Sequence, residues 1–472
     1  MALVLPALLC LTCGLVLVSL GWRRQSPRAS DLLLCASLSF GCGVGIFSVI
    51  FFLARVSGIT NVLALDLTLF ALLLASLFLL QTRAKTNVTT ALAREPFDGP
   101  IWLHRVLTAT FVVALCADVY STVLRTLAHP HGDGWDAFAI WNLHARFLFR
   151  GAAHWRDGFS LLIPWSHPDY PLLLPAAVAH FWTFLGYDAP AVPALIGLAF
   201  TLATVALLFS SLSILRGAVP AMLGGLTLLA TPSFLALGTW QYADVPLSFF
   251  ILATIVLLRL YDARHSPGFL ALAGLAAGFA AWTKNEGVLF VAAVVLARTL
   301  LIRNRRVFSS ESRLAVTHIV PLLAAILPVF LLVACFKYFV APSGDLFSDP
   351  RTMLHKLLDP LRYGVILKWY AKEFLRFGHW LLLPAPLLML AYYSFLTHPD
   401  VRSDADSGDR ASILALSLTL AGYFAIYLIT PYDLYWHLHF SLSRLFLQLW
   451  PSAIFLFFLA VPLGAAALAR GR

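Results

Sequence analysis

Side chains that can do chemistry gather in a few short polar segments of an otherwise apolar chain. The first segment, residues 128–170, holds Asp136 just after a turn marked by Gly132 and Gly134, with Asp133 three residues before it. A carboxylate in the first turn of a helix is stabilised by the helix dipole, and a carboxylate can also act as a general base. Asp136 is therefore either a plain helix cap or a catalytic base, and the sequence does not decide between Asp136 and Asp133.

The residues after Asp136 predict an amphipathic helix that lies flat on the membrane surface. Asn142, Arg146 and Arg150 recur every four residues and form a polar stripe. Large apolar side chains lie mostly on the opposing face: Trp135, Phe138, Trp141 and Leu148. Such a helix places its apolar face toward the acyl chains and its polar face toward water.

A rigid element, His167-Pro168-Asp169-Tyr170-Pro171, follows this helix. Its two prolines exclude a regular helix through the middle of the element. Rigidity at an exposed polar position suits a binding site, and it suits the start of the next helix equally well. His167, Asp169 and Tyr170 are accordingly candidate substrate-binding residues.

Further candidates stand at the ends of later apolar runs. Asp244 opens one run, Lys284 and Glu286 lie between the next two, and Arg444 ends a polar stretch at 431–444. A lone Lys at the end of a membrane span is commonly only an anchor. Asp244 and Lys284 carry opposite charges close to the apolar boundary, where a charge needs a partner, so we expect them to meet.

The composition shows which elements must position these residues. Of 472 residues, 60% are hydrophobic and only 12% are charged, which excludes a water-soluble protein. Disorder is excluded as well, because 13% of the residues are aromatic. The apolar runs are continuous rather than alternating, so we predict an all-α polytopic membrane protein.

Thirteen apolar runs are long enough to be counted as transmembrane helices. They are residues 2–20, 32–53, 62–80, 101–127, 190–212, 219–236, 243–260, 267–283, 287–302, 315–340, 376–396, 411–430 and 445–467. Clusters of Lys and Arg near 23–28, 83–105 and 303–313 all fall on one side of the membrane if the N-terminus is outside. By the positive-inside bias that side, with the C-terminus, is cytoplasmic.

This topology places the segments 128–189, 341–375 and 431–444 outside the cytoplasm. Residues 171–186 are too short and proline-rich for a span, so we expect a re-entrant or interfacial helix there. The cations of 341–375 run against the topological bias, and the phosphate of a lipid headgroup is a natural ligand for them. An interfacial helix touching ordinary anionic lipid is the alternative.

Missing motifs narrow the function. The six Cys lie in apolar runs without zinc spacing, so neither disulfides nor a structural metal are expected. The chain lacks GxxxxGK[ST], GxSxG and HExxH, which argues against an ATP-driven pump and against common hydrolases. A transporter usually places charges within its spans, whereas here they gather at one surface.

In their order and sidedness, these motifs resemble the GT-C membrane glycosyltransferases, specifically the protein O-mannosyltransferases and the lipid A aminoarabinose transferase. Asp136 matches the catalytic acid of the family's first loop, and the element beginning at His167 takes the place of its His-Pro-Pro element. Asp244 matches the second acidic position, so the resemblance makes it a second catalytic candidate, and Lys284 matches the lysine of Thr-Lys-Gly-Pro. The chain departs from the family at Ala137, where a Glu is usual, and at Asn285-Glu286-Gly287, which replaces Gly-Pro.

The resemblance implies transfer of a hexose or pentose from a polyprenyl-phosphate carrier to a lipid, glycan or protein on the outer face of a bacterial-type inner membrane. Asp136 would deprotonate the acceptor hydroxyl, and Lys284, with Arg444 or His167, would hold the lipid phosphate. Paired acids could bind a divalent cation or work without one. A lipid-carrier flippase or other transporter is the alternative function, and a non-catalytic scaffold is the third.

The resemblance also divides the chain. Residues 1–85 form N-terminal accessory helices and residues 86–302 form the catalytic core with the first outer loop, 128–189. Residues 303–472 form a C-terminal region with the outer loop 341–375.

Overall fold

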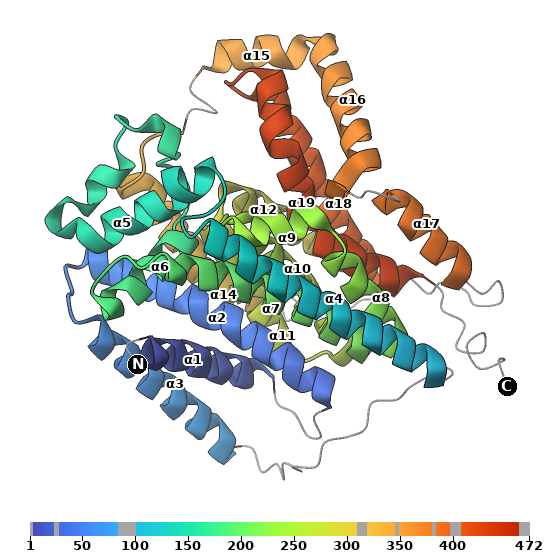
Figure 1. The fold of residues 1–472 in the computed structure, drawn as a ribbon, viewed down its shortest axis with the longest axis horizontal. Helices are drawn as coiled ribbons and strands as arrows, with labels where there is room; N and C mark the ends of the chain where they lie inside the picture. Colours follow the sequence, from blue (N-terminus) through green and yellow to red (C-terminus); the bar gives the residue numbers. More distant parts are fainter. Residues whose placement is uncertain are drawn as a thin grey trace.

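The computed structural model describes residues 3–22, 28–83, 101–308, 319–344, 349–379, 384–396 and 407–461. Within these ranges every regular element is a helix, which confirms the all-α prediction (Figure 1). Residues 23–27, 84–100 and 309–318, which hold much of the predicted cytoplasmic charge, lie outside the described residues, as does most of the predicted loop 398–410.

Ten helices in the described ranges are long and apolar enough to cross a membrane. They are α1 (Val4–Gly21), α2 (Ala29–Val56), α3 (Val62–Arg83), α4 (Ile101–Ala128), α7 (Ala191–Arg216), α10 (Asp244–Arg264), α12 (Asn285–Phe308), α14 (Val320–Phe339), α18 (Ser407–Ile429) and α19 (Leu434–Ala460). The shorter α-helices are α5 (Asn142–Arg150), α6 (Leu173–Leu185), α8 (Ala218–Leu229), α9 (Pro232–Thr239), α11 (Pro267–Thr283), α15 (Pro350–Leu358), α16 (Pro360–Arg376) and α17 (Ala385–Leu396). A π-helix, η1 (Ala137–Trp141), and the 3₁₀ turns η2 (Ala152–Phe159), η3 (Pro164–Ser166) and η5 (Phe377–His379) complete them.

The predicted count of thirteen spans is not confirmed. The run 219–236 is broken into α8 and α9, which are bent by 64°, so the count is ten, or eleven if this pair is one span. The break follows from Pro232, which starts α9 and forces Thr231 before it into extended backbone. The run 267–283 forms the short helix α11. The described part of 376–396 holds the end of α16, the turn η5 and the twelve residues of α17.

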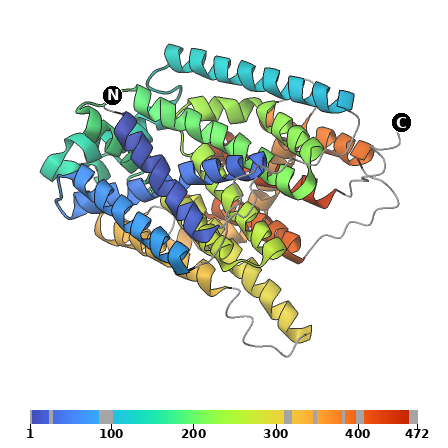
Figure 2. The same ribbon diagram turned by 90° about the horizontal axis from the view of Figure 1, so that it is seen from below.

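Helix α10 occupies the centre of the bundle, where it packs against α7, α11 and α19. Nearly all of its side chains are buried, beginning with its first residue, Asp244. Near its other end, Asp262 forms a two-pronged ion pair with Arg298 of α12, with N···O distances of 2.9 and 2.8 Å. Helix α4 runs along the outside of this bundle against α8 and α9 (Figure 2).

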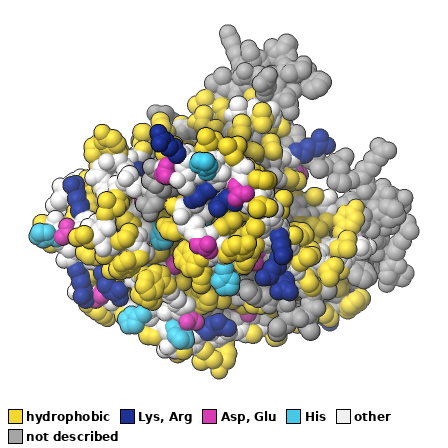
Figure 3. All heavy atoms as spheres, turned by 90° about the horizontal axis from the view of Figure 1, so that it is seen from above, with side chains coloured by type: hydrophobic (Ala, Val, Ile, Leu, Met, Phe, Trp, Pro, Cys, Tyr) yellow, Lys and Arg dark blue, Asp and Glu magenta, His cyan; other side chains and the backbone are white. Residues whose placement is uncertain are grey.

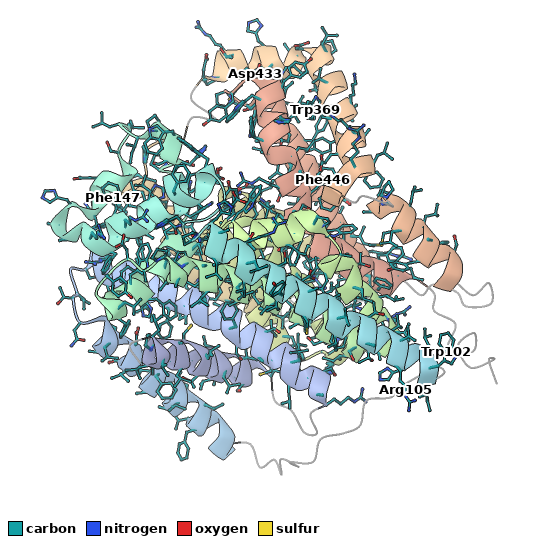
Figure 4. All side chains as sticks on the ribbon, viewed as in Figure 1. Trp102, Arg105, Phe147, Trp369, Asp433 and Phe446 are labelled. Atoms are coloured by element: carbon teal, nitrogen blue, oxygen red, sulfur yellow. The ribbon has the colours of Figure 1, made fainter. Side chains whose placement is uncertain are left out.

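Described residues of the first and last predicted outer segments lie away from the start of α4, which overlaps the predicted inner cluster 83–105. Figure 4 shows Phe147 and Asp433 far from Trp102 and Arg105, which mark the first turn of α4. The predicted short helix at 171–186 is present as α6, which is largely buried. The last predicted outer loop, 431–444, is wrong in form, because α19 already begins at Leu434 and Asp433 caps it by accepting a bond from the Trp436 N–H (2.8 Å).

Helices α15 and α16 form the second predicted outer segment. Each begins with a proline, and the side chains of Asp349 and Asp359 cap them. The cations of this segment were predicted to bind the phosphate of a lipid headgroup, and for two of them this prediction needs correction. Lys356 donates to the Thr430 carbonyl (2.6 Å) and Arg362 donates to two carbonyls at the end of α18, so both satisfy backbone groups that a helix end leaves free.

The face of the molecule that is uppermost in Figure 1 is largely apolar, and acidic and basic side chains are mixed in its middle (Figure 3). Exposed leucines on α15 and α16, such as Leu358 and Leu361, contribute to the apolar surface. Exposed apolar side chains beside amphipathic helices are typical of a protein in contact with a membrane interface.

Candidate active site

A fully buried carboxylate, that of Asp244, is the centre of the site. Its Oδ1 accepts bonds from Lys284 Nζ (3.1 Å) and Gln448 Nε2 (2.7 Å). Its Oδ2 accepts two bonds from Arg444, from Nε at 3.1 Å and Nη2 at 2.8 Å. The expected meeting of Asp244 and Lys284 is therefore present. A buried carboxylate with this many charged and amide donors is held as the anion.

Arg444 joins this centre to the first polar segment. Its Nη2 lies 2.7 Å from Asp136 Oδ2 and 2.8 Å from Asp244 Oδ2, so one guanidinium bridges the two aspartates. The guanidinium carbon also stands 4.7 Å from the centre of the Tyr242 ring, where a cation–π attraction adds to the ion pairs.

Asp136 is not a helix cap. It precedes η1, but its side chain makes no capping bond there. The alternative acid, Asp133, is 46% exposed and lies 3.9 Å from His129. The structure thus brings Asp136, and not Asp133, to the charged cluster.

The helix after Asp136 differs in part from its predicted pattern. Arg146 (3.0 Å) and Arg150 both bind Asp188, as members of a polar stripe should. Asn142, the third member, is instead buried and donates to Gln241 (2.8 Å). Gln241 immediately precedes Tyr242 and has a positive φ of 61°, so this bond fixes the turn that leads into α10.

Lys284 stands in extended backbone at the break between α11 and α12. Its ammonium group is almost fully buried and contacts both Asp244 and Glu286 Oε1, the latter at 2.8 Å. Burial by itself would lower the pKa of Lys284, but the two carboxylates outweigh burial and raise that pKa. The side chain is therefore a cation at neutral pH.

The rigid element contributes a stack of rings. His167 lies parallel to Tyr170 at 4.8 Å, and Tyr170 stacks on Trp141 of η1 at 5.6 Å. Lys284 Nζ is 5.8 Å from the centre of the Tyr170 ring. Burial lowers the pKa of His167 against the opposing effects of Asp169 and Asp136, so its imidazole is neutral at pH 7.

Asp169 ties the rigid element to two later helices. Its Oδ2 accepts bonds from Asn285 Nδ2 of α12 (2.8 Å) and from Lys337 Nζ of α14 (3.1 Å). Lys337 also donates to the Asp169 carbonyl. Sequence reasoning missed Lys337 and Gln448, because a lone Lys at a span end resembles an anchor and a lone Gln in an apolar run carries no motif.

A cavity of about 260 Å³ opens beside these groups. Lys284, Glu286, Arg444 and Asp169 form part of its polar wall, together with the rings of His167 and Tyr170. Leucine and isoleucine from α12, α18 and α19 form an apolar wall: Leu289, Ile426 and Leu445. One cavity thus presents cations, carboxylates and an apolar surface to a ligand.

The residues of this site do not suit a divalent cation. Asp136 and Asp244 are both engaged by Arg444, so they do not offer a shared set of free oxygens. Across the described ranges, His, Cys, Asp and Glu form no group of three that could hold a metal ion. The arrangement instead suits binding of an anion by Lys284 and Arg444.

A comparison with known protein families supports a membrane glycosyltransferase of the GT-C type. Residues 167–332 match the model of the dolichyl-phosphate-mannose-protein mannosyltransferase family. The match supports a sugar donor carried on polyprenyl phosphate. It covers His167, Asp244 and Lys284, whereas Asp136 and Arg444 lie outside it. No curated protein and no solved structure matches the chain significantly.

Proposed function

We propose that this chain transfers a sugar from a polyprenyl-phosphate carrier to a hydroxyl group of an acceptor on the extracytoplasmic face of a cell inner membrane. The observation that carries the proposal is the pair of cations, Lys284 and Arg444, in the wall of a cavity that also has an apolar side. Such a wall fits a phosphate attached to a hydrocarbon chain. The transferred sugar is a hexose or a pentose.

In the proposed mechanism, the donor phosphate lies against Lys284 and Arg444. As the bond between the sugar and the phosphate breaks, negative charge grows on the leaving phosphate, and fixed cations stabilise that charge without reorganising. Asp244 holds both cations in place, since it bonds to each of them. We assign Asp244 a positioning role, in contact with the groups that touch the donor.

Asp136 is the proposed general base. It lies at the same guanidinium as the phosphate site, so a hydroxyl placed between Asp136 and the sugar would lose its proton to the carboxylate. Glu286 and Asp169 are the carboxylates in the cavity wall, and they suit hydrogen bonds from sugar hydroxyl groups. His167 and Tyr170 offer ring faces on which a sugar can stack.

A transfer assay tests this function directly. The full chain in proteoliposomes is incubated with a panel of polyprenyl-phosphate hexoses and pentoses that carry a radiolabel in the sugar. We expect label to leave the carrier with at least one donor and to appear in acceptor material. Movement of the intact labelled lipid across the bilayer without cleavage would favour the flippase alternative and contradict the proposal.

The proposed orientation has its own test. On a background without the six native cysteines, Asp157→Cys should react with a membrane-impermeant thiol reagent in intact cells, because residue 157 follows the proposed outer helix. Arg305→Cys, from the basic cluster in the last turns of α12, should react only after the membrane is opened. Labelling at 305 but not at 157 in intact cells would invert the topology and remove the site from the outer face.

A further inference from the structure

A second cavity, an apolar groove of about 980 Å³, lies between α1 and α2 on one side and α11 and α14 on the other. Its lining is made mostly of apolar side chains, among them Leu20, Phe52, Ala271, Leu275, Leu332 and Phe336. Helices α1 and α2 precede the segment that matches the mannosyltransferase family. The groove therefore lies between the matched helices and the N-terminal helices.

The groove runs along the helices from one end of the bundle to the other. Gly21 and Gly268 line one end, and Val56 and Val340 line the end that carries the candidate active site. A groove of this length and composition fits hydrocarbon chains that are parallel to the helices.

One cation, Arg156 of η2, belongs to the groove lining and stands at the active-site end. Its guanidinium is 5.3 Å from the Trp155 ring, and it has no carboxylate partner among the described residues. Near the opposite end, Arg264 is 3.9 Å from Asp31 and lies over the rings of Trp22 and Phe269. Arg156 is therefore the cation available to an anionic headgroup.

A wall of aromatic rings separates the groove from the active-site cavity. Phe52 is 5.2 Å from Trp282 and 6.0 Å from Phe336, and Trp282 is 5.9 Å from Phe336, measured between ring centres. Phe336 lines the groove, whereas the next residue, Lys337, bonds to Asp169 in the cavity wall. A lipid in the groove is thus distinct from one whose phosphate binds Lys284.

We propose that the groove binds the acyl chains of a second lipid, one whose anionic headgroup lies on Arg156. This lipid is separate from the sugar donor, whose phosphate is proposed to lie on Lys284 and Arg444.

Photo-crosslinking tests the groove without relying on sugar transfer. The full chain is placed in phosphatidylcholine nanodiscs with a trace of phosphatidylglycerol that has a diazirine in one acyl chain; diazirine phosphatidylcholine is the neutral comparison. We expect phosphatidylglycerol to label the groove residues of α11 and α14 about fivefold more, which is the effect of one cation on an anionic lipid. Arg156→Gln should remove this preference, and the matched variant Arg264→Gln should keep it.

A groove-filling variant provides the second arm. Ala271→Trp should abolish labelling of the groove by both probes. Val113→Trp should not, because Val113 on α4 is 68% exposed and lies away from the groove lining. Equal labelling by the two lipids that is unaffected by Arg156→Gln would mean ordinary surrounding lipid and would overturn the proposal. Loss of the phosphatidylglycerol label under excess polyprenyl phosphate would assign the groove to the donor chain and overturn it as well.

The labelling assay and the transfer assay test the two proposals separately, so either proposal can be contradicted while the other stands. Preferential labelling without sugar transfer would contradict the proposed function and keep the lipid site. Sugar transfer without preferential labelling would contradict the lipid site and keep the function.

Discussion

The variant Asp136→Asn is expected to lower the rate of sugar transfer by about 10²–10⁴-fold, the usual loss when a general base is removed. Asparagine keeps the shape of the side chain and still offers an oxygen to Arg444, so the chain should fold and insert normally. It cannot take the proton of the acceptor hydroxyl. The measurement is kcat with saturating donor and acceptor, together with donor affinity measured separately.

Asp133→Asn is the matched control, because Asp133 lies three residues away and is half-exposed beside His129. Its turnover should stay near normal. An inactive Asp133→Asn with an active Asp136→Asn would show that the base is misassigned. A loss of donor affinity with unchanged kcat in Asp136→Asn would instead make Asp136 a group that positions Arg444.

The variant Lys284→Ala should weaken donor binding by about 10- to 100-fold, the range expected when a hydrogen bond to a charged group is lost. Lys284→Arg should restore the affinity only in part, because a planar fork does not reproduce a point charge. The measurement is donor affinity in nanodiscs. Unchanged affinity and turnover in Lys284→Ala would leave Lys284 an anchor and remove the phosphate site.

The loss of Lys284 also leaves Asp244 and Glu286 with one cation fewer, and breaking a buried ion pair costs about 3–5 kcal/mol. A double variant, Lys284→Gln with Glu286→Gln, separates instability from lost binding because it removes one charge of each sign. We expect its thermal unfolding to return toward that of the native chain. Its donor affinity should remain low.

Helices were predictable from the sequence where a long, continuous run of apolar residues is enough to define them. Long continuous runs such as 32–53 and 101–127 became α2 and α4 with small shifts at the ends. The predictions failed where a local residue decides the ending. Pro232 breaks one apolar run, and the Asp433 cap starts α19 inside a stretch rich in polar and aromatic residues, which sequence composition suggests is a loop.

The sequence indicated most of the residues that form the site. It did not indicate most of the hydrogen bonds and ion pairs between them. Opposite charges at the ends of neighbouring spans indicated that Asp244 and Lys284 would meet, and they do. No pattern indicated that one arginine would bind both Asp136 and Asp244, because that contact depends on how distant helices pack. Gln448 was missed because a lone Gln in an apolar run carries no motif, and its bond to Asp244 also depends on how distant helices pack.

The bridging position of Arg444 decides when the proposed site can assemble during synthesis of the chain. Arg444 is 200 residues after Asp244 in the chain, on the last described helix. While the ribosome is still making the intervening segments, Asp244 and Lys284 can already pair, but Asp136 has no guanidinium to hold it. On the proposed mechanism, the site is therefore complete only after α19 has entered the membrane and joined the bundle.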